Sequence, residues 1–323
     1  MKITSLVFAA LVATATAPVL VAGEDSLAAD NAAKLAKVKR SLTSQAHRLR
    51  YNFRPGETIR YKVVHLVTVE TTIKGTTQTA KSRAASTKAW QVSEAAEGGK
   101  IIFVHQIDNV EMWQKVSGRQ AIRYSSMTDK TPPPTYKIAA ESVGLPLSVV
   151  TMDVRGKIIN REDKRRQRGL GGDRLTVPLP PGMVKVGDTW VAPRVIRVTL
   201  KNGNTKKIKT RDLYRLEKVE SGVATISVKT QILTPVYDPQ VKANLVQRLT
   251  HGTIKFDIDA GRILSQQLDV DETVIGFRGA NSVMKCLGRF TEKLLPGDVK
   301  SARKPSPPAG DMPSSTTPEK KSR

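Results

Sequence analysis

Apolar and polar residues alternate along much of the chain between residues 57 and 295, with the period of two that is typical of β-strands with one buried face. In the clearest run, 57–73, one phase carries mostly apolar side chains, namely Ile59, Tyr61, Val63, Val67, Val69 and Ile73. At about 3.3 Å per residue this run predicts a strand roughly 50 Å long, whereas ordinary strands have about 5–6 residues. Such a length favours a strongly curved sheet or a barrel wall over a flat sandwich.

The next predicted strand, from Thr76 to Val92, has small side chains on both faces before it reaches Trp90. They belong to Thr77, Thr79, Ala80, Ser82, Ala84, Ala85, Ser86 and Ala89. Small residues facing an apolar wall leave room for a ligand, but they also fit beneath a covering helix or on an exposed edge. The sequence leaves these three alternatives open.

The second half of the chain repeats the alternation over residues 187–274. Asn202-Gly203 predicts a tight hairpin, because both residues tolerate the positive φ of a type I′ turn. Asp238-Pro239 predicts the start of a helix, because Pro fits the first helical position and Asp fits the cap before it. A shorter helix is expected near 136–143.

The two halves suggest an internal duplication, since Trp90 and Tyr214 each precede a Gly by eight residues and a Val by fourteen. The predicted fold is mainly β, with long antiparallel strands in a curved sheet, half-barrel or two-sheet arrangement and one or two covering helices. The expected organisation is a signal peptide at 1–23, a helical or partly ordered leader at 24–50, a first β half at 51–160, a basic Gly/Pro-rich linker at 161–185, a second β half at 186–296 and a disordered basic Pro/Ser-rich tail at 297–323.

The start of the chain indicates export. Met1-Lys2 is followed by about twenty apolar or small residues and then by Val21-Ala22-Gly23, which suits signal-peptidase cleavage. An uncleaved membrane anchor is the alternative. The one cysteine, Cys286, cannot form an intramolecular disulfide. Export without disulfides favours a bacterial envelope protein, located in the periplasm or at the cell surface.

The formal net charge of +24 predicts attraction to polyanions such as anionic lipid headgroups or acidic glycans, although solubility alone also explains it. Nucleic acid is not an expected partner, because aromatic residues make up only 5% of the chain and stacking platforms would be sparse. The charge therefore indicates a class of surface without naming a ligand.

No motif for catalysis or metal binding occurs in the sequence. It lacks a Gly-x-Ser-x-Gly elbow, a phosphate-binding loop, a His-Glu-x-x-His pair and a cysteine pair for zinc. Asp257-x-Asp259-x-Gly261 resembles part of a calcium loop, but Leu268 stands where the twelfth-position Glu belongs, so a simple turn is the better interpretation. We therefore expect no catalytic residues, no metal and no cofactor.

Two groups of candidate binding residues follow from the alternation. The inward phases of the predicted strands supply candidates for a cavity lining, namely Tyr61, Val63, His65, Trp90, Trp190 and Tyr214. The opposite phase of one second-half strand supplies candidates for docking to anionic surfaces, namely Lys207, Lys209 and Arg211.

The turn and strand-entry segments resemble those of uncharacterised exported bacterial proteins that are grouped as domains of unknown function in planctomycete-like and Bacteroidetes-like genomes. These segments are Arg-Pro-Gly-Glu-Thr-Ile-Arg-Tyr at 54–61, Val-Gly-Asp-Thr-Trp at 186–190 and Asp-Ala-Gly-Arg-Ile-Leu at 259–264. The resemblance covers about residues 50–295 and implies architecture but no activity. A looser, fold-level similarity is to periplasmic lipoprotein carriers of the LolA and LppX kind, whose curved sheets hold acyl chains.

The sequence thus predicts an exported, non-enzymatic binding protein that holds an apolar or amphipathic ligand, such as a lipid, in the concavity of its sheet. The alternative is a structural or interaction protein that docks an anionic glycan, a membrane surface or another protein through its basic face. A hydrolase is a third hypothesis, and it would need His65 or His105 close to a Ser and an Asp. The oligomeric state is not predicted.

Overall fold

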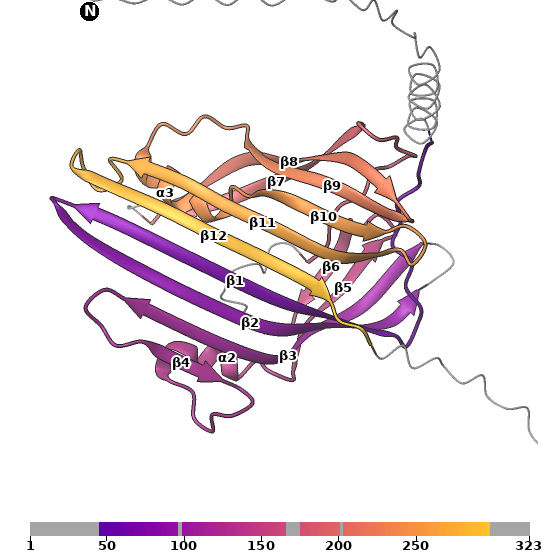
Figure 1. Cartoon of the computed structure of the whole chain (residues 1–323), viewed down its shortest axis with the longest axis horizontal. Coiled ribbons are helices and arrows are strands. Elements are labelled where there is room, and N and C mark those ends of the chain that lie inside the picture. Colours follow the sequence, from indigo (N-terminus) through magenta and orange to yellow (C-terminus); the bar gives the residue numbers. More distant parts are fainter. Residues whose placement is uncertain (1–44, 96–98, 166–174, 201–202, 298–323) are drawn as a thin grey trace, which may run out of the picture. The chain divides into compact units, whose positions relative to one another are not determined.

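The computed structural model describes residues 45–95, 99–165, 175–200 and 203–297 (Figure 1). Within them, twelve strands form one antiparallel sheet in the order β6-β5-β3-β2-β1-β12-β11-β10-β9-β8-β7, with β4 added beside β3. The strands are β1 (Thr58–Ile73), β2 (Thr76–Ala95), β3 (Lys100–Val116), β4 (Ile122–Ser125), β5 (Pro146–Asp153), β6 (Ile158–Asp163), β7 (Thr189–Thr199), β8 (Thr205–Glu220), β9 (Val223–Ile232), β10 (His251–Asp257), β11 (Arg262–Ile275) and β12 (Ser282–Leu294). The predicted mainly β fold of long antiparallel strands is confirmed, as one open sheet.

The two halves of the chain meet in the middle of this sheet. The first strand pairs with the last, in a ladder that runs from Tyr61 opposite Leu294 to Ile73 opposite Ser282. Each half therefore contributes one side of a continuous sheet, and the ladder between β1 and β12 joins them. The duplication itself stays a prediction.

The sheet curves around a short segment, residues 47–53, that precedes β1. The backbone N–H of Tyr51 donates to the carbonyl of Val154, in the turn between β5 and β6, at 2.7 Å. The ring of the same Tyr51 makes an edge contact with Phe256 of β10, with 5.6 Å between centroids. In a flat sheet, β5 and β10 would lie about 30 Å apart at roughly 4.8 Å per strand. We call the face of the sheet that packs against this segment the inward face and the opposite face the outward face.

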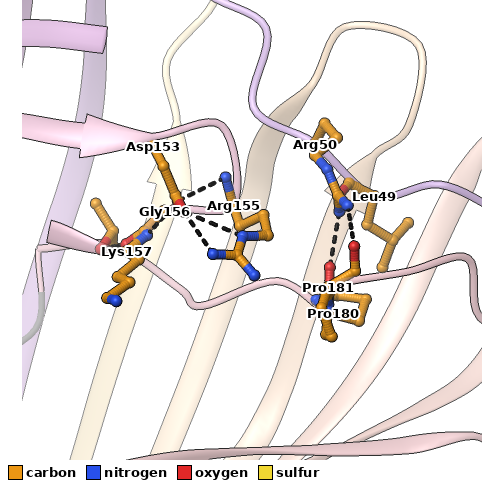
Figure 2. Close-up of polar contacts among 9 residues, drawn as sticks. Leu49, Arg50, Asp153, Arg155, Gly156, Lys157, Pro180 and Pro181 are labelled. Carbon is orange, nitrogen blue, oxygen red and sulfur yellow. Dashed lines mark hydrogen bonds and ion pairs between the residues drawn. The ribbon is translucent and has the colours of Figure 1, made fainter. Parts of the chain in front are cut away.

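One end of the inward face is filled by two plug segments, residues 47–53 and 175–186. They bring seven buried apolar side chains into the core: Leu49, Tyr51, Phe53, Leu175, Val177, Leu179 and Val184. Arg50 joins the two segments, because its guanidinium donates to the carbonyls of Pro180 at 2.7 Å and Pro181 at 2.5 Å (Figure 2). Burial, together with neighbouring Arg48 and Arg155, lowers the pKa of Arg50 from its ordinary value.

The glycine turn between β5 and β6 lies directly against the plug segments. Gly156 has φ +76°, and a Cβ there would lie 2.5 Å from the ring of Tyr51 and 2.7 Å from the carbonyl of Val177. Asp153 stabilises the turn by accepting hydrogen bonds from the backbone of Arg155 and Lys157, both at 2.9 Å (Figure 2). Only glycine combines the positive φ with so close an approach.

Short helices cover part of the inward face away from the plug segments. They are η1 (Pro134–Tyr136), α2 (Lys137–Ala140), α3 (Pro239–Leu245) and η2 (Val246–Arg248). The Asp238 carboxylate caps α3 by accepting from the backbone N–H of Gln240 at 2.8 Å. Helix α3 buries Val241 and Leu245 against β7 and β8. Segment η2 then buries Val246 among side chains of β11 and β12.

The domain organisation stays a prediction, with one difference in detail. Residues 161–163 of the predicted linker belong to β6, and residues 175–185 contribute Leu175, Val177, Leu179 and Val184 to the core. In residues 175–185 the apolar side chains lie among prolines, and this composition is typical of a linker. The signal peptide, most of the leader, residues 166–174 and the tail from 298 onward lie outside the described residues.

Candidate ligand-binding surface on the inward face

An aromatic core lies next to the plug segments and contains four of the six predicted lining residues. Trp90 stacks on Phe103 with 4.6 Å between centroids, and Tyr61 meets the edge of Trp90 at 5.6 Å. In the second half of the chain, Trp190 of β7 and Tyr214 of β8 stack at 5.5 Å. All five rings are buried, so this part of the inward face is filled with side chains.

A buried ion pair borders the aromatic core. Lys88 of β2 pairs with Glu292 of β12, and the exposed fractions of their side chains are 10% and 2%. The Lys88 ammonium also lies 4.8 Å from the ring centroid of Tyr61 and 4.6 Å from that of Trp90. The Gln266 amide of β11 donates to the other carboxylate oxygen of Glu292. A buried charge needs such partners, because removal from water costs several kcal/mol per ion.

Several neutral polar groups on the same face have no hydrogen-bond partner among the described residues. They are the Tyr61 hydroxyl, the Trp90 indole N–H, His105 Nδ1 and the Ser148 hydroxyl. Trp90, His105 and Ser148 stand directly opposite one another on β2, β3 and β5. Each unpaired buried group costs about 1–3 kcal/mol. These groups make the region next to Lys88 polar, and each of them lowers the free energy of unfolding.

The ionisation of this region follows from its burial. Burial lowers the pKa of His105 to about 3, assisted by the positive charges of Lys88 and Arg161. Burial alone lowers the pKa of His65 to about 4. Burial, and secondarily the Glu292 carboxylate, raises the pKa of Tyr61 well above its ordinary value. Both histidines and the tyrosine are therefore neutral at pH 7.

Beyond the ion pair, the inward face becomes partly exposed and carries small or apolar side chains. We call this surface the inner strip and define it by His65 and Val67 of β1, Ser82 and Ala84 of β2, Met112 of β3 and Phe290 of β12. These residues are neighbours by register, since His65 stands opposite both Ala84 and Phe290, and Ala84 stands opposite Met112. The His65 and Phe290 rings lie 4.6 Å apart. The inner strip faces inward, yet other side chains cover it only in part.

A second buried charge lies on the inward face of the second half. Asp212 of β8 is 2% exposed and accepts from the Thr230 hydroxyl at 2.8 Å. Arg194 of β7 lies 3.5 Å from the same carboxylate. This group separates the aromatic core from the cluster that α3 covers.

The structure places the predicted residues on the expected faces. All six lining candidates face inward, but Tyr61, Trp90, Trp190 and Tyr214 pack into the filled core, and Val63 is buried beside them. His65 alone among them belongs to the inner strip. The docking candidates Lys207, Lys209 and Arg211 are exposed on the outward face of β8. Whether any of these nine residues binds a ligand stays a prediction.

The sequence reading missed the buried charges, although a signal for them was present. Lys88 falls in phase with Trp90, Glu292 falls in phase with Phe290, and Asp212 falls in phase with Tyr214. A charged residue on an otherwise apolar phase of a strand is costly to bury unless it has a partner. Such a break in the phase therefore marks the positions where a buried partner should be sought.

Among the described residues, no helix combines the length and the apolar character needed to cross a bilayer. The same residues contain no group of three or more His, Cys, Asp and Glu side chains that could hold a metal ion. Fold and surface thus define a mainly β protein with one open antiparallel sheet and a partly uncovered inward face.

Comparisons with known proteins do not identify a family. No protein-family model matches the chain, and no curated protein matches it. A lipovitellin structure that concerns lipid–protein interactions is 12% identical with a TM-score of 0.41, over 76% of this chain and 25% of the lipovitellin chain. The chain thus spans about a quarter of that protein.

Two further solved structures show weaker likeness. The translocator domain of the autotransporter NalP from Neisseria meningitidis is 8% identical, with a TM-score of 0.28 over 83% of this chain and 97% of that domain. A DUF1329 family protein from Desulfovibrio piger is 11% identical, with a TM-score of 0.13 over 80% and 90% of the two chains. All these likenesses are too distant to support an argument about function, and the resemblance to exported proteins of unknown function stays a prediction.

Proposed function

We propose that the protein is a non-enzymatic binding protein that holds an apolar or amphipathic ligand against the inner strip. The observation that carries this proposal is that His65, Val67, Ala84 and Phe290 face inward and yet remain partly exposed. Inward residues of a packed sheet are normally covered, because burial of apolar surface is worth about 25 cal/mol per Å². An apolar ligand would gain this free energy by covering the inner strip.

The position of the ion pair supports an amphipathic ligand. Ser86 separates Ala84 of the inner strip from Lys88 on the same phase of β2. An acyl chain or similar apolar group would lie along the small side chains of β2, and its polar end would lie towards Lys88 and Glu292. The small side chains matter because they leave space between the strand and whatever covers it.

The test is a matched pair of small-to-large substitutions on β2. Ala84→Trp fills the inner strip, whereas Lys81→Trp adds the same side chain at an exposed position of the outward face. Binding of a dansyl-labelled long-chain fatty acid to delipidated protein is followed by fluorescence. We expect at least a tenfold loss of affinity for Ala84→Trp and none for Lys81→Trp.

Native mass spectrometry after gentle purification gives an independent readout. A co-purifying lipid that is absent from the Ala84→Trp variant would support the proposal. No co-purifying lipid together with no binding of the labelled fatty acid would refute it. A stable dimer whose formation Ala84→Trp abolishes would also refute it, because a second copy would then cover the inner strip.

The second candidate function is docking to an anionic envelope surface through the outward face of β8. Lys207 and Lys209 are exposed and have no ion-pair partner among the described residues, and Arg211 donates to the Gln231 side chain at 2.7 Å. Each basic residue near an anionic membrane contributes about 1 kcal/mol. Co-sedimentation with vesicles of phosphatidylglycerol should fall when all three become Ala, whereas salt-insensitive binding would exclude this function.

We also propose that the protein is exported. The basic and apolar start of the chain supports this proposal, since it has the composition of a signal peptide. Expression with a C-terminal tag in a Gram-negative host, followed by fractionation and mass determination, tests it. Full-length protein in the cytosolic fraction would contradict export.

A further inference from the structure

The outward face of the first half carries a pocket built around Trp113, far along β3 from the aromatic core. The pocket has a volume of about 400 Å³ and is lined by Arg83 of β2, Glu111 and Trp113 of β3, Arg123 and Ser125 of β4, and Asp129 among others. This volume lies within the range of small-ligand sites, roughly 300–1,000 Å³. Met112 is the one inner-strip residue that also lines the pocket.

The strand register places Trp113 between two arginine residues. Trp113 stands directly opposite Arg83 on one side and directly opposite Arg123 on the other. Side chains directly opposite each other on one face have Cβ atoms about 4.5–5.5 Å apart. Trp113 is partly exposed, unlike the buried Trp90 and Trp190. An indole kept accessible in a pocket offers a flat apolar platform with a polar rim.

The charges around this platform balance. Arg83 pairs with Glu111 at 2.8 Å, and the Asp129 carboxylate accepts from the backbone N–H of Ser125 at 2.8 Å. Arg123 is exposed and has no ion-pair or hydrogen-bond partner among the described residues. Two cations thus face two carboxylates among the lining residues, so a polyanion or a phosphate gains no net attraction here.

We propose that this pocket binds a neutral saccharide. One face of a pyranose ring presents C–H groups that pack on an indole, while its hydroxyls both donate and accept hydrogen bonds. Arg123 supplies donors for these hydroxyls. The second oxygen of Glu111 supplies an acceptor, and Asp129 Oδ1, which accepts from the Thr128 hydroxyl at 3.0 Å, has a further lone pair for another. A charged ligand would instead need an excess of one sign. The proposal is independent of the binding function of the inner strip.

The experiment screens the full chain on an array of neutral and acidic glycans and then measures the best neutral oligosaccharide by calorimetry. Trp113→Ala is expected to lower the affinity at least tenfold, and Trp113→Phe to lower it less, because a smaller ring keeps part of the platform. Arg123→Gln is expected to lower the affinity severalfold. Lys115→Ala, an exposed change on the same strand outside the pocket, is the matched control and should change nothing.

Circular dichroism and the melting temperature establish that each variant folds. If Trp113→Ala does not fold, the Trp113→Phe and Arg123→Gln variants carry the test. Binding of no neutral glycan, binding of acidic glycans only, or neutral-glycan binding that the pocket variants leave unchanged would each overturn the proposal. Retained binding of the labelled fatty acid by these variants shows that the inner strip is a separate site.

Discussion

Removal of one partner from the Lys88–Glu292 pair should destabilise the fold strongly. Both side chains are almost completely buried, at 10% and 2% exposure, and Glu292 has Gln266 as its other partner. Breaking a buried pair leaves an uncompensated charge and costs about 3–5 kcal/mol. The loss of the contacts between Lys88 and the rings of Tyr61 and Trp90 adds to this cost for the lysine variant. Lys88→Met and Glu292→Leu are the two single variants.

The double variant separates the charge effect from simple packing. With both charges gone, the desolvation penalty disappears with the Coulombic attraction, so an apolar replacement of the pair is often neutral or stabilising by about 1–4 kcal/mol. We therefore expect the double variant to be more stable than either single variant. Urea unfolding followed by circular dichroism gives the four free energies of unfolding, and their combination gives the coupling energy of the pair.

The exposed pair Arg83–Glu111 is the matched control. It too joins two strands of the sheet, here the neighbours β2 and β3, but the exposed fractions of its side chains are 37% and 63%, so its coupling energy should be below about 1 kcal/mol. Single variants of Lys88 and Glu292 that each cost less than about 1 kcal/mol, with additive effects in the double variant, would refute the buried-pair reasoning.

The other predictions concern acid stability and the glycine turn. Burial lowers the pKa of His65 to about 4 and of His105 to about 3, below the unfolded value near 6.5. The free energy of unfolding should therefore be highest above pH 6.5 and fall as the pH decreases from there towards 3. The loss, up to about 3 kcal/mol for His65 by linkage, should shrink in His65→Gln, and an unchanged acid slope would contradict this. Gly156→Ala should lower the free energy of unfolding more than Gly118→Ala, because both glycines have positive φ but only a Cβ at position 156 would clash with its neighbours. Equal urea midpoints for the two variants would contradict this explanation.

The period of two predicted the strands well, because successive residues of a half-buried strand face the core and the solvent in turn. The phase of Ile59, Tyr61 and Val63 is the buried phase of β1, and Asp238-Pro239 does start α3. The pairing of β1 with β12 could not be read in the same way. It joins residues more than 200 positions apart along the chain, and no local pattern specifies which strands become neighbours.

The plug segments were unpredictable for a related reason. Residues 175–186 contain three prolines and a glycine among their apolar residues, so their composition is that of a linker. They are ordered by contacts with distant residues, such as the Arg50 guanidinium on the carbonyls of Pro180 and Pro181 and the Trp190 indole on the carbonyl of Pro178. Hydrogen bonds from distant side chains to backbone carbonyls do not depend on the pattern of apolar and polar residues, so that pattern cannot predict them.

The location of a binding surface depends on side-chain size more than on aromatic character. Trp90, Tyr61, Trp190 and Tyr214 seemed good lining candidates, but large rings on an inward phase fill the space that they face. Space remains where the strand opposite a wall has small side chains, as β2 does at Ser82 and Ala84. On the outward face, side-chain size has the opposite consequence. There a large ring such as Trp113 stays accessible, and the same residue type that closes the inner core can form a platform for a ligand.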